Sequence, residues 1–323
     1  MNVLVTGNLS AGILERIRRD HAVAVNDQDR PMEREALLAA VAGKAGLLTM
    51  LTDRVDDELF DRAPDLKVVA NCAVGYDNID VAAATRRKIA VSNTPGVLTD
   101  STADLALALM LAVGRRMMEG DRQVREGRFR AFAPFRFLGK DISGKVLGIV
   151  GLGRIGRAVA RRAAGFGMRL QYHQRNRLSA ADEAALGVRF ADLDRLLETS
   201  DVISLHVPLT PGTRHLIGAA QLRRMKPAAI LVNTARGPVV DETALVEALR
   251  EGRIGGAGLD VYENEPQLAP GLAALDNAVL LPHVGSATIE TRTRMATLAA
   301  DNLVAGLRGE VPPNCLNPEI FNR

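Results

Sequence analysis

The sequence predicts an α/β protein made of two Rossmann-like or flavodoxin-like parallel-sheet domains, and three observations support this fold class. Short apolar runs alternate with helical patterns along the first 95 residues, and a second series of the same kind begins near residue 145. The first strand of the second series leads into a glycine-rich turn and an amphipathic helix. Strands that alternate with helices form parallel sheets, because each helix is the crossover between two strands.

The first series extends from the N-terminus to about residue 96. β-rich runs predict strands at 2–6, 21–26, 45–51, 67–71 and 89–93. The segments between them predict helices at 11–20, 33–42, 55–62 and 78–88.

A change of pattern after this series marks the expected domain boundary. Pro95 and Gly96 break the chain. Capping residues near 99–102 predict the start of one long helix that runs to about Gly127. The segment 128–144 has the composition of a loop.

The second series supplies the remaining elements. Its expected strands lie at 145–150, 168–173, 201–206, 228–233, 255–262 and 278–282, and a last helix is expected at about 288–308.

Composition excludes several classes of protein. The 323 residues are 47% hydrophobic and 24% charged, with a net charge of only +3 and 3% aromatic residues. This balance predicts well-packed cores and no nucleic-acid partner. The longest apolar run, 105–113, is too short to span a bilayer, and the N-terminus does not resemble a signal peptide. Cys72 and Cys315 are isolated, so we expect no disulfide framework, no metal site and a cytoplasmic location.

The glycine-rich turn predicts a dinucleotide site. Gly151, Gly153 and Gly156 form a GxGxxG pattern between an apolar strand and an amphipathic helix. In such a site the first glycine permits a tight turn, the second lets backbone approach the pyrophosphate, and the third lets the helix pack on the strand. The N-terminus of the helix then offers free N–H groups to the phosphates.

The stretch "QYHQRNRL", at 171–178, bears on the choice of cofactor. An Asp or Glu at the end of this strand would accept hydrogen bonds from the ribose hydroxyls of NAD. The chain instead has Gln174, Arg175, Asn176 and Arg177, and no acid before Asp182. A guanidinium attracts a 2′-phosphate, which a carboxylate would repel. We therefore predict NADP(H) as the preferred cofactor, with NAD(H) possible, and favour Arg175 over Arg177, which could be a solvated turn residue.

Three strand ends in the second half carry candidate catalytic groups. Arg236 lies in the turn after one strand, where an arginine can hold a substrate carboxylate with two hydrogen bonds. Asp260, Glu263 and Glu265 follow the next strand, and His283 follows the one after. A histidine oriented by a carboxylate suits a proton donor to a carbonyl group.

The other histidines are assigned lesser roles. We interpret His21 as a strand-edge residue and His215 as a loop residue, while His173 and His206 end strands and could touch the cofactor. Only His283 is expected to have a neighbouring loop that carries acids.

Together these blocks resemble the D-isomer-specific 2-hydroxyacid dehydrogenase family, and most closely its glyoxylate/hydroxypyruvate reductase branch. The resemblance covers nearly the whole chain and implies two domains with a cleft between them, a discontinuous substrate domain at 1–96 plus 291–323 and a cofactor domain at 97–290. The matching blocks are "NCAVGYDNIDV", "NTPGVLTDSTADLALALMLAVGRR", "LGIVGLGRIG", "HVPLTPGTRH", "LVNTARGPVVDE", "GAGLDVYENEP" and "LPHVGSAT".

The resemblance also implies roles for individual residues. Catalysis would fall on Arg236, on Glu265 and on His283 as the acid/base group that is paired with Glu265. Substrate would be bound by Arg236, by His283 and by the backbone N–H groups of Val74 and Gly75. Thr99 would contact a cofactor phosphate, Val207 and Pro208 would line the adenine–ribose wall, and Asp260 would hold the nicotinamide carboxamide. The full cofactor set would be Thr99, Gly151, Leu152, Gly153, Arg154, Ile155, Gly156, Gln174, Arg175, Asn176, His206, Val207, Pro208, Thr213, Thr234, Ala235, Arg236, Asp260, His283 and Gly285.

The expected activity is NADPH-dependent reduction of a small 2-oxo acid to the D-2-hydroxy acid, in a homodimer to which the long helix contributes. The chain departs from the glyoxylate/hydroxypyruvate branch by having no tryptophan, and it has Phe129, Phe132, Phe135 and Arg136 where tryptophans are usual. Alternatives are a D-3-phosphoglycerate or 2-ketogluconate-type dehydrogenase of the same family, and a non-catalytic corepressor-like protein that senses NAD(P).

Overall fold

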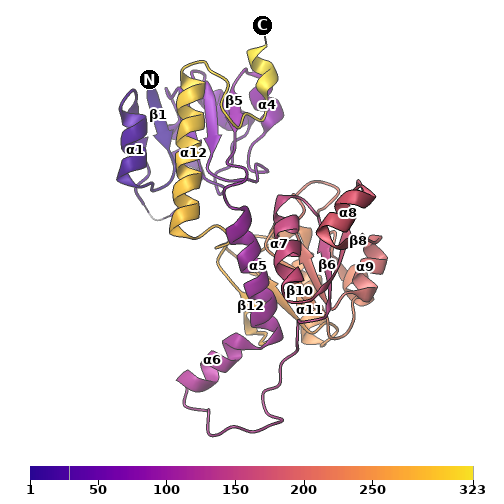
Figure 1. Cartoon of the computed structure of the whole chain (residues 1–323). Coiled ribbons are helices and arrows are strands. Elements are labelled where there is room, and N and C mark those ends of the chain that lie inside the picture. The colour runs from indigo at the N-terminus through magenta and orange to yellow at the C-terminus, as the bar shows by residue number, and fades with distance from the viewer. Residues whose placement is uncertain (29, 323) are drawn as a thin grey trace. The chain divides into compact units, whose positions relative to one another are not determined.

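The computed structural model describes residues 1–28 and 30–322, which divide into two compact units. Unit 1 comprises Met1–Leu98 and Ala287–Arg323, and unit 2 comprises Thr99–Ser286. Each unit is a parallel sheet covered by helices on both faces, so the predicted α/β class with two parallel-sheet domains is confirmed (Figure 1). The sequence placed the boundaries at 96/97 and 290/291, and the structure divides at 98/99 and 286/287.

Unit 1 contains a sheet of strand order β2-β1-β3-β4-β5 in which all described pairs are parallel. Its elements are β1 Asn2–Val5, α1 Ala11–Arg18, β2 Ala22–Val25, α2 Arg34–Ala40, β3 Gly46–Thr49, α3 Asp57–Arg62, β4 Val68–Asn71, α4 Val81–Arg86, β5 Ala90–Ser92, α12 Ile289–Leu307 and the short helix Pro318–Phe321. Asp56, Asp80 and Thr288 cap the first turns of α3, α4 and α12 with their side-chain oxygens.

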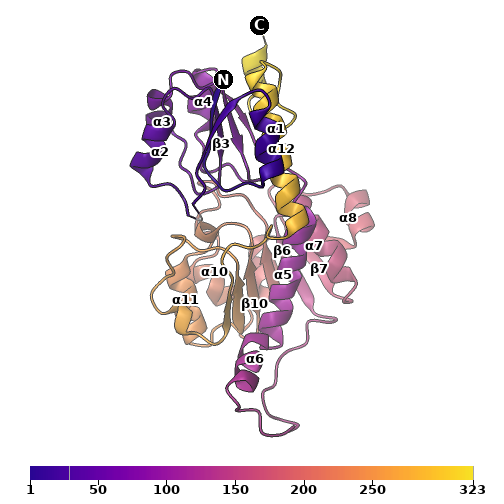
Figure 2. The same ribbon diagram turned by 90° about the vertical axis from the view of Figure 1, so that its left-hand side faces the viewer.

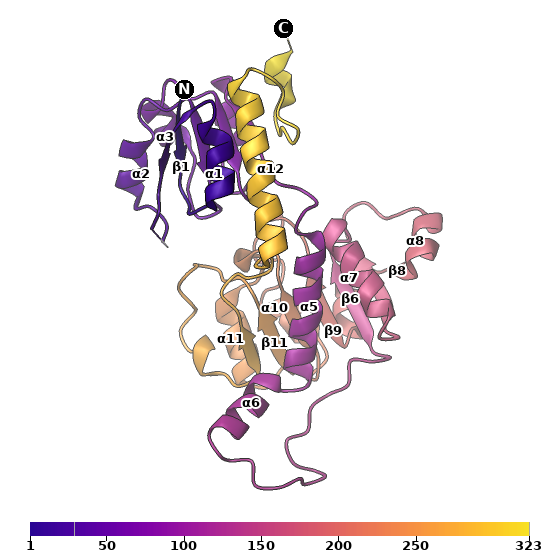
Figure 3. The same cartoon turned by 60° about the vertical axis from the view of Figure 1, so that its left-hand side comes forward.

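The C-terminal helix α12 completes one face of the unit 1 sheet. It lies beside α1 and packs on β3, β4 and β5 (Figure 3). Gly306 allows this close approach, because a Cβ atom there would lie 2.6 Å from the Val68 side chain. The helices α2, α3 and α4 cover the opposite face with a separate apolar cluster.

Unit 2 contains a sheet of strand order β12-β11-β10-β9-β6-β7-β8, again parallel at all described pairs. This is the doubly wound order, with its switch point between β6 and β9. Its elements are α5 Thr99–Gly114, α6 Met117–Arg125, β6 Val146–Val150, α7 Arg154–Ala164, β7 Arg169–His173, α8 Ala180–Leu186, β8 Val188–Phe190, α9 Leu193–Thr199, β9 Val202–Leu205, α10 Ala219–Arg224, β10 Ile230–Asn233, α11 Glu242–Arg250, β11 Gly256–Leu259, β12 Ala278–Leu280 and short helices at Gly237–Val239 and Leu272–Ala274.

Two apolar clusters cover the faces of the unit 2 sheet. Helices α5 and α7 pack on one face, and α9, α10 and α11 pack on the other. Figure 2 shows α5 and α7 on one side of the sheet and α10 and α11 on the opposite side. Strand β8 and helices α8, α9 and α10 were not predicted from the sequence. The predicted strand at 255–262 ends at Leu259, which leaves Asp260 and the acids after it in a turn.

The prediction of one helix over 99–127 is wrong. Helix α5 ends at Gly114 and α6 begins at Met117, because Arg116 between them has a left-handed conformation with φ of 51°. The carbonyl of Gly114 accepts a hydrogen bond from the N–H of Lys140 at 2.6 Å, and the Arg116 guanidinium lies 4.3 Å from the centre of the Phe137 ring. Contacts from the following loop therefore stabilise the end of the helix. The loop supplies a donor for the Gly114 carbonyl, which lies in the last turn, and an aromatic ring for the Arg116 guanidinium.

Candidate active site

The candidate catalytic residues of unit 2 follow three strands that are neighbours in the sheet. Arg236 follows β10, Glu265 follows β11 and His283 follows β12. The carboxyl ends of parallel strands meet at one edge of a sheet, which is the edge where ligands bind in open α/β folds. The fold therefore brings together the three residues that the sequence singled out.

The turn that carries Arg236 is fixed by the buried residue Asn233. The Asn233 side chain donates to the carbonyl of Arg236 at 2.9 Å and accepts from the N–H of Ala235 at 3.0 Å. Gly237 then packs against the next turn, and a Cβ atom there would lie 1.8 Å from the carbonyl of Tyr262. Only a glycine fits at this position, so the Arg236 turn is held directly against the turn that precedes Glu265.

His283 and Glu265 form an ion pair, with 2.9 Å between Nδ1 and Oε2. The other carboxylate oxygen of Glu265 accepts from the N–H of Tyr262 at 3.0 Å. Burial raises the pKa of Glu265. The bond to His283, the bond from Tyr262 and the charge of Arg236 lower it by more than burial raises it, so the pKa lies below its usual value. A charged carboxylate at Nδ1 orients the imidazole, and Nε2 has no protein partner among the described residues.

Asp260 supports the loop that carries His283. It is 1% exposed, and its two carboxylate oxygens accept from the N–H groups of Val284 at 2.7 Å and Gly285 at 2.8 Å. Burial raises the pKa of Asp260, and these two bonds partly oppose that shift. The carboxylate therefore has a structural use in addition to the nicotinamide contact that the resemblance implies.

The expectation that only His283 would have an acid-bearing loop as neighbour is wrong. His215 lies 2.5 Å from Glu263, measured from Nε2 to Oε1. His215 also has a left-handed backbone, with φ of 51°. Sequence reasoning also missed Asn233 and Tyr262, although their places at a strand end and beside the acids were signals that could have identified them.

The glycine-rich turn fits a dinucleotide. Gly151 has φ of +93°, and a Cβ atom on it would lie 2.7 Å from the carbonyl of His206. A Cβ atom on Gly156 would lie 2.2 Å from the carbonyl of Gly151, whereas one on Gly153 would meet no atom within 4 Å. The outer glycines are thus required by the fold, and the middle glycine faces open space at the N-terminus of α7, where phosphates bind.

Three further expected cofactor residues lie in the neighbouring loops. Thr234 fits a polar ligand, because its hydroxyl is buried and has no hydrogen-bond partner within 1–28 and 30–322. His206 lies just past β9, its Nε2 is 2.8 Å from the Ser204 hydroxyl, and burial lowers its pKa to about 4. The Thr213 hydroxyl donates to the carbonyl of Pro208 at 2.6 Å and so closes its own loop.

The two arginines in the turn after β7 that could bind a phosphate differ in their contacts. Arg177 forms two hydrogen bonds to Glu183, at 2.8 and 3.0 Å, and is therefore committed to α8. Arg175 is exposed and forms no ion pair with any residue that the structure describes. Gln174 accepts from the N–H of Leu152 at 3.3 Å and so ties this turn to the glycine-rich turn.

In unit 1, two buried asparagines shape the 73–75 loop. Asn93 donates to the carbonyl of Val74 at 2.7 Å, and Asn71 donates to the carbonyl of Gly75 at 2.8 Å. In the described part of the chain, no group accepts from the N–H of Val74 or Gly75. The loop therefore presents two free donors, as a carboxylate-binding loop requires.

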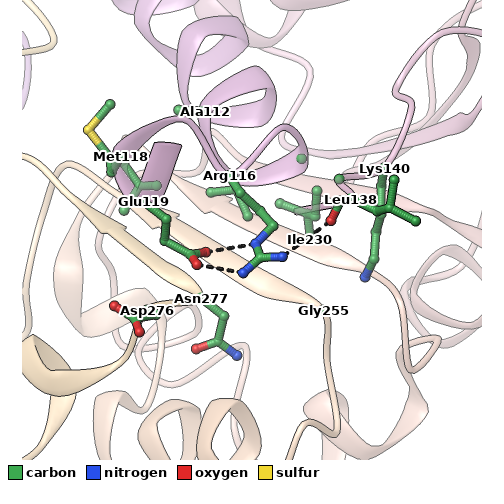
Figure 4. Close-up of a pocket in the computed structure, with 14 residues that line it drawn as sticks. Ala112, Arg116, Met118, Glu119, Leu138, Lys140, Ile230, Gly255, Asp276 and Asn277 are labelled. Carbon is green, nitrogen blue, oxygen red and sulfur yellow. Dashed lines mark hydrogen bonds and ion pairs between the residues drawn. The ribbon is translucent and has the colours of Figure 1, made fainter. Parts of the chain in front are cut away.

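A cavity of about 390 Å³ lies at the opposite edge of the unit 2 sheet, at the amino ends of β10, β11 and β12. It is lined in part by Arg116, Glu119, Lys140 and Asp276, and Arg116 pairs with Glu119 at 2.6 Å (Figure 4). None of its lining residues belongs to the predicted site. No described helix is long and apolar enough to cross a membrane, and no metal-binding cluster of His, Cys, Asp or Glu occurs within 1–28 and 30–322.

Comparison with known proteins identifies the family. The family model of the D-isomer-specific 2-hydroxyacid dehydrogenase NAD-binding domain matches residues 107–285. A glyoxylate reductase of Korarchaeum cryptofilum is 52% identical over 321 residues, which is 98% of this chain and 96% of that protein.

Solved structures show the same fold over the full length. A protein from Thermus thermophilus superposes with a TM-score of 0.92 at 49% identity, covering 98% of this chain and 100% of that one. The NADPH-dependent glyoxylate/hydroxypyruvate reductase of Sinorhizobium meliloti, in complex with NADP and malonate, superposes with a TM-score of 0.87 at 34% identity, covering 100% of this chain and 98% of that one. The chain has a glycine-rich turn after β6, and it has Arg236, Glu265 and His283 after three neighbouring strands. Together with these relatives, this shows that the chain belongs to the D-isomer-specific 2-hydroxyacid dehydrogenase family of NAD(P)-dependent oxidoreductases.

Proposed function

We propose that this enzyme reduces a small 2-oxo acid of the glyoxylate/hydroxypyruvate type to the D-2-hydroxy acid. The observation that carries the proposal is the Glu265–His283 pair, which leaves Nε2 of the imidazole free on the loop after β12, two strands along the sheet from Arg236 on the loop after β10. Relatives named glyoxylate reductase, which match along the whole chain, support the same substrate class.

In this proposal each catalytic residue has one task. The Arg236 guanidinium binds the substrate carboxylate with two hydrogen bonds and orients the adjacent carbonyl group. Glu265 holds Nδ1 of His283, so that Nε2 carries the proton that is given to the carbonyl oxygen as it becomes a hydroxyl. A bound nicotinamide supplies the hydride. Val74 and Gly75 offer further N–H donors for a carboxylate.

The cofactor would be held by the expected set of residues. The glycine-rich turn and the start of α7 bind the pyrophosphate. Asp260, after β11, and Gly285, after β12, are joined by a hydrogen bond of 2.8 Å, and we assign them to the nicotinamide. We propose NADPH as the preferred form, because Arg175 is free to pair with a 2′-phosphate while Arg177 is not.

Assembly and location are part of the same proposal. Phe129, Phe132 and Phe135 are between 66% and 88% exposed on the segment that follows α6, which projects from the body of unit 2 (Figure 1). Exposed aromatic groups of this kind support a homodimer interface. The isolated thiols of Cys72 and Cys315 suit a cytoplasmic location.

Steady-state kinetics with glyoxylate and hydroxypyruvate, and analysis of the configuration of the product, test this function. We expect turnover to the D-isomer and a loss of roughly 10²–10⁴ in kcat for His283→Asn, which removes the proton donor. Turnover of only bulkier 2-oxo acids would move the substrate class to the 2-ketogluconate type. Tight cofactor binding without turnover of any 2-oxo acid would favour the corepressor-like alternative.

A further inference from the structure

Two glutamates outside the catalytic set connect the turns that carry it. Glu242, the first residue of α11, is 5% exposed. Its carboxylate accepts from the N–H of Glu263 at 2.7 Å and from the N–H of Ala269 at 2.9 Å. A buried carboxylate thus holds both sides of the β11 loop through backbone donors.

The connection is reciprocal. Oε2 of Glu263 accepts from the N–H of Glu242 at 3.3 Å, while the N–H of Glu263 donates to Glu242. The two residues exchange side-chain-to-backbone hydrogen bonds between the start of α11 and the loop after β11. Hydrogen bonds to charged groups are stronger than neutral ones, so the pair is an effective clamp between the loops.

Glu263 also reaches a third loop. Its Oε1 atom is 2.5 Å from Nε2 of His215 and 3.6 Å from the guanidinium of Arg214. The N–H of His215 in turn donates to the carbonyl of Pro238 at 2.8 Å. The loops after β9, β10 and β11 therefore meet at one carboxylate, and that carboxylate is only 18% exposed.

The clamp lies next to the catalytic groups without containing them. Gly237, directly after Arg236, packs on the peptide bond between Tyr262 and Glu263. The N–H of that peptide bond belongs to Glu263 and donates to the carboxylate of Glu242. The N–H of Tyr262 is held by Glu265 itself. A displacement of the 262–263 peptide would thus move both Arg236 and the carboxylate that orients His283.

We propose that Glu263 and Glu242 are positioning residues, which together with His215 lock the Arg236 turn against the Glu265 turn in the geometry for reduction. The inference rests on the proposed function, because it assigns these residues to the orientation of its catalytic groups. Neither glutamate is assigned contact with substrate or with the transferred proton.

The test compares Glu263→Ala and Glu263→Gln with wild type and with Glu198→Ala. Glu198 is a matched control, since it is a glutamate of α9 in unit 2 whose ion pair, with Arg224 at 2.8 Å, lies outside these loops. We expect Glu263→Ala to lower kcat/KM for the 2-oxo acid by roughly ten- to a hundredfold, through a higher KM and a lower kcat, because small displacements of oriented groups are costly. We expect Glu198→Ala to behave as wild type.

The activity of Glu263→Gln shows whether Glu263 acts through its hydrogen bonds or through its negative charge. The amide oxygen can accept from the N–H of Glu242, and the amide nitrogen can donate to Nε2 of the His215 ring. We therefore expect Glu263→Gln to recover kcat/KM to within about threefold of wild type. His215→Ala should cause a smaller loss, and adding it to Glu263→Ala should cost little more, since the two act through one contact.

Amide hydrogen exchange gives a readout that does not depend on turnover. Glu263→Ala should speed exchange in peptides that cover 234–243 and 261–270, and Glu198→Ala should leave them unchanged. If the alanine variant keeps wild-type kinetics and exchange, or if the glutamine variant is as impaired as alanine, the positioning role is wrong. If wild type reduces no 2-oxo acid but the exchange result holds, the clamp exists and the proposed function fails.

Discussion

The proposed NADPH preference rests on one exposed side chain, and Arg175→Ala tests it directly. Arg177 is bound to Glu183 by two hydrogen bonds, so Arg175 is the guanidinium of this turn that is left for a 2′-phosphate. A hydrogen bond to a charged group contributes about 1.5–3 kcal/mol. Arg175 is exposed and screened by solvent, so we take the lower end, which corresponds to roughly a tenfold effect.

The assay is kcat/KM for NADPH and for NADH at a saturating 2-oxo acid, in wild type and variants. Arg175→Ala should lower the value for NADPH by roughly tenfold and leave the value for NADH unchanged, because NADH has no 2′-phosphate. Raised salt should weaken the NADPH preference of wild type alone, since screening acts on the exposed pair.

Arg223→Ala is the matched control. Arg223 is an exposed arginine of α10 that forms no ion pair within the described ranges, and α10 ends at the other edge of the sheet. It should change neither cofactor. Equal losses with NADPH and NADH in Arg175→Ala, or wild-type preference in that variant, would refute the assignment of Arg175 to the 2′-phosphate.

Three further predictions concern the site and its stability. Glu265→Gln should lower kcat by roughly ten- to a hundredfold with the Kd of reduced cofactor unchanged, since the uncharged amide orients His283 less well; the fluorescence of the reduced nicotinamide measures that Kd. Gly237→Ala should cost about 1–3 kcal/mol of unfolding free energy and raise KM, because its Cβ would lie 1.8 Å from a backbone carbonyl; a wild-type Tm would contradict the close packing. His206 has a pKa of about 4 in the folded chain against a usual 6.5, so the unfolded chain takes up its proton first as pH falls, and wild type should lose about 2 kcal/mol more than His206→Gln between pH 7 and pH 5 in chemical denaturation.

The sequence was sufficient to predict the two parallel sheets, because buried strands are near-continuous apolar runs and their helical crossovers are amphipathic. It also identified the strand ends after β10, β11 and β12, since polar residues at the carboxyl end of a buried strand have few structural reasons to be there. These positions share one sheet edge whatever the details of the loops.

Features that depend on distant contacts were not predictable. The break at Arg116 is stabilised by Lys140 and Phe137, more than 20 residues away, while local helix propensity continues through it. The pair of His215 and Glu263 joins residues 48 positions apart in two irregular loops, where no periodic pattern exists. Both cases show tertiary contacts deciding a conformation that local sequence leaves open.

The place of α12 in unit 1 has a consequence for the order in which the chain folds during synthesis. The strands β3, β4 and β5 are complete by Ser92, but the helix that covers one of their faces begins at Ile289. About 200 residues separate them, which at ordinary elongation rates is roughly ten to forty seconds. Throughout that interval β3, β4 and β5 lack the helix that covers one of their faces, whereas unit 2 is continuous in sequence and needs no later segment. We therefore expect unit 1 to complete its core only after all of unit 2 has been synthesised, although the strands of unit 1 are made first.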